Sequence, residues 1–144
     1  MSNIRSLLLG TWRLTSFETR HGDDPPTYPF GEDADGVLTY TDDGHMWAAV
    51  WRRDRPLFAI ADQQAGTPDE YSAAVKTYIQ YVGRFEYDDQ NRSVTHHIEQ
   101  SIFPNWNGSD QVRFVNIAGD HLELTTPPVE FGGLVIGSLA WRRS

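Results

Sequence analysis

A histidine and a carboxylate lie two residues apart in the segment Val94–Ser101, where they could do acid–base chemistry. The β-branched residues and the alternation of this segment predict a β-strand. Successive side chains of a strand point to opposite faces, so His97, Glu99 and Ser101 share one face, and His96 lies on the other. If the first face lines a cavity, His97 and Glu99 form a candidate catalytic pair; if it faces water, it is an ordinary polar surface.

The expected chemistry depends on desolvation inside such a cavity. Burial would raise the pKa of Glu99 and lower that of His97, which brings both groups toward neutral pH. Arg113 lies on the next expected strand, where hairpin pairing could place it near Glu99 or Ser101. An arginine there would keep Glu99 ionised, which favours a base or a clamp for a ligand carboxylate. The alternative is a structural polar network that does no chemistry.

Aromatic side chains are numerous, and several could line the same cavity. Tyr81 and Phe85 share one face of a predicted strand with Gly83, which either leaves room for a ligand or marks a bulge. The Tyr81 hydroxyl could donate to a carbonyl or enolate oxygen. Trp106 lies in a loop, either as a lid over the cavity or as an anchor on the outside. Aromatic groups with a few polar groups are typical of a small-molecule pocket, although core packing would also explain them. The candidate ligand-binding residues are Tyr40, His45, Trp47, Phe85, Ser101, Asn105 and Trp106.

Metal and cofactor motifs find little support. His45, His97 and Glu99 are the right types for a site of two histidines and one carboxylate, but His96 and His97 face opposite ways and no H-E-x-x-H spacing occurs. No G-x-G-x-x-G, P-loop or G-x-S-x-G motif is present either. We therefore expect no metal, no cofactor and no serine-hydrolase chemistry.

The composition predicts one folded domain, residues 1–144, and limits its partners. Hydrophobic residues make up 39% and aromatic residues 12% of the chain, which favours a packed globular fold. The net charge is -8, and seven acidic residues between Asp23 and Asp43 are accompanied by no Lys or Arg. Such a surface disfavours nucleic acids and anionic membranes as partners.

The chain contains no cysteine, so disulfides and thiolate chemistry are excluded. The apolar run Leu7–Leu9 is too short for the core of a signal peptide. No stretch approaches the roughly 20 apolar residues that a membrane helix needs. We expect a cytoplasmic protein with a small-molecule partner, and the sequence leaves a homodimer open.

The expected elements are short strands separated by polar turns, with one helix between the third and fourth strands. Thr67 can cap a helix that Pro68 begins and Glu70 supports through a capping box. Apolar residues then follow at helical spacing from Tyr71 to Tyr78, which predicts about three turns lying across an opening or a face of the sheet. Strands are expected over 11–19, 36–41, 45–51, 81–87, 93–101, 111–117, 121–126 and 136–142. The fold class is thus mainly β, an antiparallel up-and-down barrel of about eight strands.

Several segments resemble a known family. Gly10-Thr11-Trp12 is similar to the G-x-W pattern of lipocalins, and the resemblance continues in three further segments. These segments are Pro29–Asp33 with Gly36, Tyr40 and Gly44; Tyr81–Phe85; and His96–Arg113. Together they resemble the bacterial and fungal lipocalin-like domain family over nearly the whole chain. The resemblance implies a calyx-like barrel in which the tryptophan plugs the closed end and an arginine of the last strand, Trp141-Arg142-Arg143, packs over it.

These observations lead to one functional hypothesis and its alternatives. We expect the barrel to bind a small, mainly apolar organic molecule and to perform cofactor-free acid–base chemistry of the isomerase or cyclase type on it. Glu99 would be the base or charge partner and His97 would shuttle the proton, while Tyr81 and Arg113 would stabilise negative charge. The alternatives are a non-catalytic carrier of a small hydrophobic metabolite, and a partner-binding barrel with a filled interior.

Overall fold

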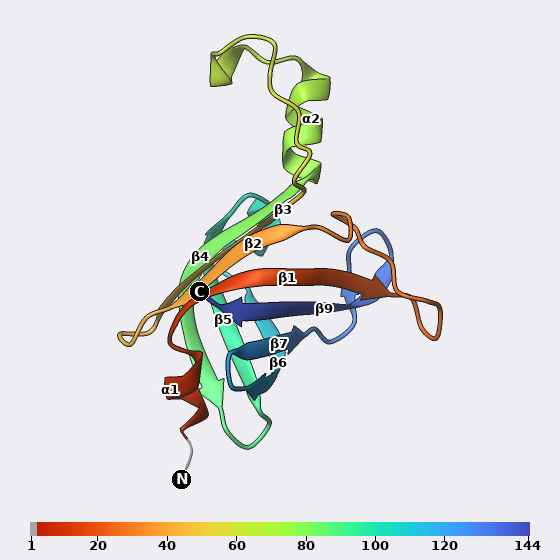
Figure 1. The fold of residues 1–144 in the computed structure, drawn as a ribbon. Helices are drawn as coiled ribbons and strands as arrows, with labels where there is room; N and C mark the ends of the chain where they lie inside the picture. The colour runs from red at the N-terminus through yellow and green to blue at the C-terminus, as the bar shows by residue number, and fades with distance from the viewer. Residues whose placement is uncertain (1–2) are drawn as a thin grey trace.

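The computed structural model describes residues 3–144 and forms a closed antiparallel β-barrel (Figure 1). Each strand pairs with its neighbour in sequence from β1 to β7, β7 then pairs with β9, and β9 pairs with β1 to close the barrel. The strands are β1 (Gly10–Arg20), β2 (Asp35–Tyr40), β3 (His45–Trp51), β4 (Tyr78–Asp88), β5 (Ser93–Ser101), β6 (Asp110–Ala118), β7 (His121–Thr125), β8 (Val129–Glu130) and β9 (Leu134–Arg143). The predicted eight-stranded barrel is confirmed, with the short β8 added as a hairpin partner of β9.

Alternation along each strand places apolar side chains inside the barrel and polar ones outside. In β4, Tyr81 and Phe85 are buried and Arg84 between them is exposed. Closure joins β1 to β7 and β9 in one ring, in which each strand forms backbone hydrogen bonds with both of its neighbours. The barrel therefore has one interior, shared by a packed core and a cavity.

The closed end of the barrel carries α1 (Ile4–Leu8) and a buried tryptophan. Trp12 is fully buried and its indole N–H donates to the carbonyl of Leu8 at 2.9 Å. The guanidinium of Arg143 lies 4.1 Å from the centre of the Trp12 ring and donates to the carbonyl of Leu9 at 2.8 Å. The arrangement that the lipocalin resemblance implies is thus present, with Arg143 as the arginine.

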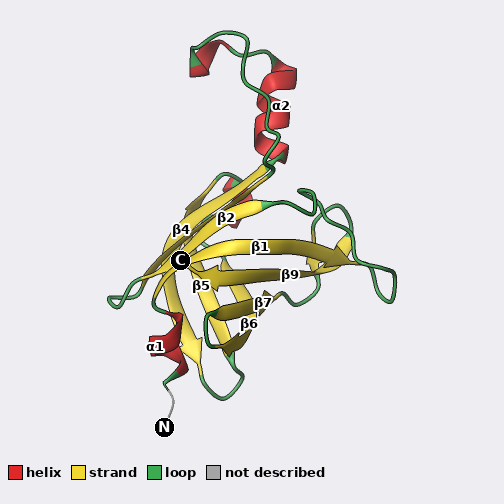
Figure 2. Cartoon of the chain, viewed as in Figure 1, coloured by secondary structure: helices red, strands yellow, loops and turns green. Residues whose placement is uncertain are grey.

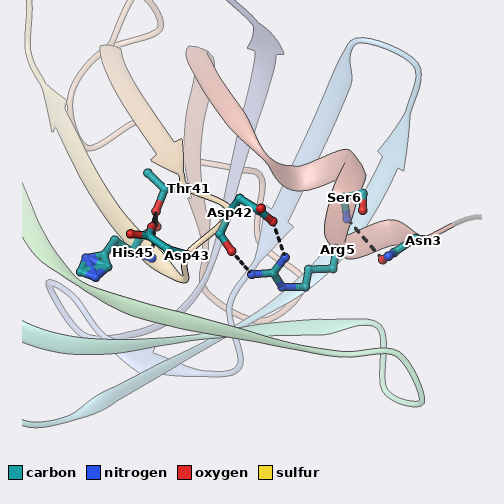
Figure 3. Close-up of polar contacts among 7 residues, drawn as sticks. All are labelled: Asn3, Arg5, Ser6, Thr41, Asp42, Asp43 and His45. Carbon is teal, nitrogen blue, oxygen red and sulfur yellow. Dashed lines mark hydrogen bonds and ion pairs between the residues drawn. The ribbon is translucent and has the colours of Figure 1, made fainter.

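The turn between β2 and β3 lies at this same closed end. Arg5 of α1 donates to the backbone carbonyl of Asp42 in that turn at 2.8 Å (Figure 3). The backbone N–H of His45 donates to the Thr41 hydroxyl at 3.0 Å, which closes the turn. His45 therefore lies at the plugged end of the barrel.

The segment between β3 and β4 projects from the barrel as an arm (Figure 1). It contains the short 3-10 helix η1 (Gln63–Ala65) and α2 (Pro68–Lys76), both shown as helices in Figure 2. The capping box of Thr67 and Glu70 is present, so the predicted helix start is confirmed. Its placement was wrong: no residue of α2 is buried, and the helix stands away from the barrel instead of covering it. Tyr71 of its apolar stripe packs on Phe58 of the same arm at 5.5 Å.

A β-bulge interrupts the pairing of β4 with β5. Val82 pairs with Gln100 while the next residue, Gly83, pairs with Ile98, so Glu99 is the extra residue. A side chain at Gly83 would collide with the backbone carbonyl of His97, and only glycine permits this close approach. The second of the two readings of Gly83, a bulge, is the one that the structure shows.

Candidate ligand-binding site

A cavity of about 380 Å³ occupies the barrel interior near β8 and the turn η2 (Pro104–Trp106). Its wall is mostly apolar and includes Phe17, Leu38, Ile79 and Leu139. The polar and charged residues that line it are Thr19, Tyr81, His96, Gln111, Arg113, Thr126 and Glu130. A volume of this size and lining suits one small organic molecule whose few polar atoms meet the polar groups.

His96 is the central polar residue of this interior. It is 1% exposed, and its two ring nitrogens each meet a tyrosine hydroxyl. Nε2 lies 2.6 Å from the hydroxyl of Tyr40 and Nδ1 lies 2.7 Å from the hydroxyl of Tyr81. Strands β2, β4 and β5 thus contribute one side chain each to a buried hydrogen-bonded chain, and Tyr81 is the tyrosine of this chain that reaches the cavity.

Burial dominates the ionisation of these three groups. It holds the pKa of His96 well below its ordinary value of 6.5, and the positive charge of Arg113 acts in the same direction. It raises the pKa of Tyr40 and of Tyr81, which the charge of Arg113 partly opposes. At neutral pH, His96 is therefore a neutral imidazole between two neutral phenols.

Arg113 is the basic group of the cavity. It lies on the inner face of β6, where the register places it opposite Val94. The expected position near Glu99 or Ser101 was therefore wrong, although β5 and β6 do pair as a hairpin. Its guanidinium donates to the carbonyl of Val112 at 2.9 Å and to the side-chain oxygen of Gln111 at 3.2 Å. Within residues 3–144, no carboxylate forms an ion pair with it.

Trp106 forms part of the cavity wall at the η2 turn. Its ring packs edge-on against the rings of Tyr81 and Phe103, with distances between ring centres of 6.2 Å and 5.3 Å. Both Phe103 and Trp106 come from the segment that joins β5 to β6. Of the two expected places for Trp106, the structure shows the one at the cavity.

His97 and Glu99 do not face the cavity. The buried side chains of this part of β5 are Val94, His96 and Ile98, so the inner face is the even-numbered one. His97 lies outside, where Nδ1 is 2.7 Å from Asp110 and Nε2 is 3.3 Å from Glu86. Glu99 is exposed at the bulge, 3.8 Å from Arg84. The orientation that the sequence argument assumed was wrong for both residues.

The other expected ligand-binding residues lie outside the cavity wall. Tyr40 and Phe85 are buried and pack against each other at 4.7 Å, in the core next to His96. Trp47 is 44% exposed on the outer wall, and His45 lies at the closed end. Ser101 donates to the side-chain oxygen of Asn107 at 3.0 Å, so it stabilises the η2 turn. Asn105 in that turn is exposed, and it does not line the cavity either.

His96 was not among the predicted site residues, although the sequence contains a signal for it. Val94 and Ile98 are apolar and share the face of His96, whereas Thr95, His97 and Glu99 on the other face are polar. In a barrel with an apolar interior, the face with Val94 and Ile98 is the one that turns inward. This pattern predicts His96, and not His97, as the histidine of the site.

Over residues 3–144, no group of three His, Asp or Glu side chains converges on a point that could hold a metal ion. The carboxylates of Asp110 and Glu86 approach different nitrogens of His97, on opposite sides of its ring. Within the same range, none of the helices has the length and apolar character needed to cross a membrane.

A closed antiparallel barrel with an apolar cavity and few polar groups belongs to the class of small-molecule-binding β-barrels. The sequence comparisons agree: the chain belongs to the lipocalin-like domain family, whose profile matches residues 9–144. A relative from Aspergillus oryzae is described as a 4'-hydroxy-3'-methoxypropiophenone carrier protein. It is 38% identical over 106 residues, an alignment that covers 68% of this chain and 96% of the relative.

Proposed function

We propose that this protein binds a small, mainly apolar aromatic molecule inside the barrel and acts as a carrier or binding protein for it. The observation that supports this proposal is the cavity of about 380 Å³, with its apolar wall and a few polar residues, among them Tyr81, His96 and Arg113. The aromatic side chains Phe17, Trp106 and Trp141 offer flat surfaces to an aromatic ring. The relative described as a carrier of an aromatic ketone supports the same class of ligand.

The test is a calorimetric binding titration with 4'-hydroxy-3'-methoxypropiophenone. Ala48 lines the cavity and the next residue, Ala49, belongs to the outer face of β3. Ala48→Phe fills the cavity, and we expect binding to fall by about tenfold or more. Ala49→Phe adds the same ring outside and should bind as the wild type does. Equal binding by wild type and a folded Ala48→Phe would refute a site in the cavity.

Acid–base catalysis on the bound molecule is a second candidate, and the Tyr81–His96 contact of 2.7 Å favours it. The Tyr81 hydroxyl can give its proton to the carbonyl oxygen of the bound molecule and recover one from His96, while Arg113 stabilises a developing enolate. Such chemistry would serve an isomerase or a cyclase. Catalysis of this kind predicts that, in D₂O, the wild-type protein exchanges the protons on the carbon next to the ketone of the probe. The exchange should be faster than in buffer alone or with the Tyr81→Phe variant. Exchange at the buffer rate, measured by NMR with saturated protein, would leave binding as the function.

A further inference from the structure

The hydrogen atoms of the Tyr40–His96–Tyr81 chain can be assigned from its contacts. A neutral imidazole has one N–H and one bare nitrogen, so one tyrosine must donate to the ring and the other must accept from it. The Tyr40 hydroxyl is buried, and within residues 3–144 its one hydrogen-bond partner is Nε2 of His96. If Tyr40 accepted from Nε2, its own proton would be buried without a partner, at a cost of about 1–3 kcal/mol. Tyr40 therefore donates to Nε2.

The orientation of Tyr81 follows from that of Tyr40. Because Nε2 accepts, Nδ1 has the proton and donates to the Tyr81 oxygen across 2.7 Å. The Tyr81 proton then has no acceptor within this group of three residues. Of the three, Tyr81 and His96 line the cavity and Tyr40 does not. Both ring nitrogens of His96 are already occupied. The chain thus presents the cavity with a hydrogen-bond donor.

Two further groups make the cavity rich in donors. Arg113 lines it with a positive charge that no carboxylate pairs with in the described chain. The indole N–H of Trp141 is buried and has no hydrogen-bond partner among the described residues 3–144, and Trp141 also lines the cavity. The one carboxylate of the wall, Glu130, is exposed on β8 and forms no ion pair with Arg113. Buried donors without partners are unfavourable unless a ligand supplies acceptors.

We propose that the cavity holds its ligand as an anion, with an ionised phenol or carboxyl oxygen accepting hydrogen bonds from Tyr81 and Arg113. Tyr40 and His96 are positioning residues, which keep the Tyr81 proton directed at that oxygen. This inference depends on the proposed function, since it concerns the ligand of the same cavity. It adds the charge state of the ligand and the reason why a histidine that touches two tyrosines is buried there.

The first experiment measures the ionisation of a bound phenol. The probe is 4'-hydroxy-3'-methoxypropiophenone, whose phenolate form absorbs at longer wavelength than the phenol. We expect its pKa to fall by about one unit or more in the complex, because a nearby cation favours the anion. An unchanged or higher pKa in the complex would overturn the proposal while leaving the binding function intact. Failure of the probe to bind at all would instead count against the proposed function.

Variants and a second probe assign the effect to residues. Arg113→Gln should return the pKa of the bound phenol to its value in water or above. The dimethoxy analogue of the probe cannot ionise. At a pH where the phenol of the probe is ionised in water, we expect the analogue to bind roughly tenfold more weakly than the probe. This difference corresponds to the loss of one charge-assisted hydrogen bond. Equal affinities for the two probes, or an Arg113→Gln complex with the wild-type pKa, would contradict the assignment.

The positioning role is tested by NMR of the His96 ring nitrogens. The wild type should show the proton on Nδ1, whereas Tyr40→Phe leaves Nε2 without its donor and should populate the Nε2–H form. The same variant should move the pKa of the bound phenol toward its value in water, although Tyr40 does not line the cavity. Tyr87→Phe is the matched control, because the Tyr87 hydroxyl has no hydrogen-bond partner in the part of the chain that the structure describes. A wild-type proton on Nε2, or equal effects of the two variants, would refute the positioning role.

Discussion

Two adjacent histidines of β5 occupy opposite environments. His96 is 1% exposed between two tyrosine hydroxyls, and burial holds its pKa well below 6.5. His97 is on the outer wall, where the hydrogen bond to Asp110 raises its pKa above 6.5; burial opposes this shift, and the hydrogen bond to Glu86 adds to it. The barrel wall is one residue thick, so a step of one position along the strand exchanges a buried imidazole beside the cavity for one on the outer surface.

The comparison shows that a pair of acid–base residue types does not by itself define a site. His97 has the better acid–base partners in sequence and in space, yet water surrounds them and screens their charges. His96 has only two phenols, but they lie next to the cavity where polar contacts are strong. The polarity of the wall therefore decides which histidine can affect a ligand.

Removal of the buried histidine should have the largest effect. His96→Ala leaves the hydroxyls of Tyr40 and Tyr81 without their partner, and we expect a loss of about 3 kcal/mol in the free energy of unfolding. His97→Ala removes exposed contacts and should cost less than about 1 kcal/mol. Urea unfolding of both variants measures the difference. Similar losses for the two would contradict the contrast between the inner and outer faces.

The two histidines should also give stability opposite dependences on pH. The pKa of His96 is lower in the folded than in the unfolded protein, so its contribution is complete above pH 6.5 and is lost as the pH falls below that value. The pKa of His97 is raised, so its contribution is complete below pH 6.5 and is lost as the pH rises above it. The larger shift belongs to His96, and the wild type should therefore lose up to about 1.4 kcal/mol per pH unit between pH 6.5 and 5.5.

Variants separate these two contributions. His97→Gln should remove the gain in stability that acidification gives above pH 6.5 and leave the loss below pH 6.5 in place. His96→Gln should remove the loss over the same range, so that stability changes little or rises slightly as the pH falls from 7.5 to 6. Denaturation midpoints in buffers of constant ionic strength give the slopes. An unchanged slope in His96→Gln would show that another group titrates there.

A smaller effect is expected from the outer carboxylate. Asp110→Asn removes the nearest charge to His97, whose Nδ1 lies 2.7 Å from it. We expect the pKa of His97 to fall by about one unit in an NMR titration, while the His96 resonances stay unchanged. Movement of the His96 pKa by a similar amount would mean that the barrel wall does not insulate the two rings.

The smallest effect is expected at Tyr87, whose hydroxyl has no hydrogen-bond partner among residues 3–144. Its hydroxyl is buried without a hydrogen bond, and burial raises its pKa. Tyr87→Phe removes an unsatisfied polar group, so stability should change by less than about 0.5 kcal/mol, in the favourable direction. Tyr40→Phe removes a hydroxyl that donates 2.6 Å from Nε2 and should cost about 1 kcal/mol. Equal effects in thermal unfolding would remove the distinction between the two hydroxyls.

Much of the fold could be predicted from local patterns. Thr67, Pro68 and Glu70 specify a helix start through their own hydrogen bonds, and the alternation in each strand is a property of neighbouring residues. The tryptophan plug could be predicted because Gly10-Thr11-Trp12 has a family counterpart. The position of α2 could not, because an apolar stripe such as Tyr71 and Val75 does not say what will cover it.

Half of the expected catalytic residues, Tyr81 and Arg113, lie at the cavity, and the other half, His97 and Glu99, do not. The first two lie on strands whose inner faces are marked by buried aromatic and aliphatic neighbours, such as Phe85 and Val115. His97 and Glu99 were chosen by chemistry alone, without weighing the apolar Val94 and Ile98 on the opposite face. The contact of His96 with Tyr40 joins residues 56 positions apart, which no local pattern indicates.

Composition and periodicity alone indicated a mainly β chain of short strands and determined that positions 96 and 97 point in opposite directions. Those properties follow from bonds and torsions within a few residues. The tertiary structure decided which of these two directions faces the interior and which tyrosines contact His96. It also decided that Arg113 pairs with Val94 of β5. These outcomes depend on the register between strands, which is set by packing across the whole interior rather than by any one segment.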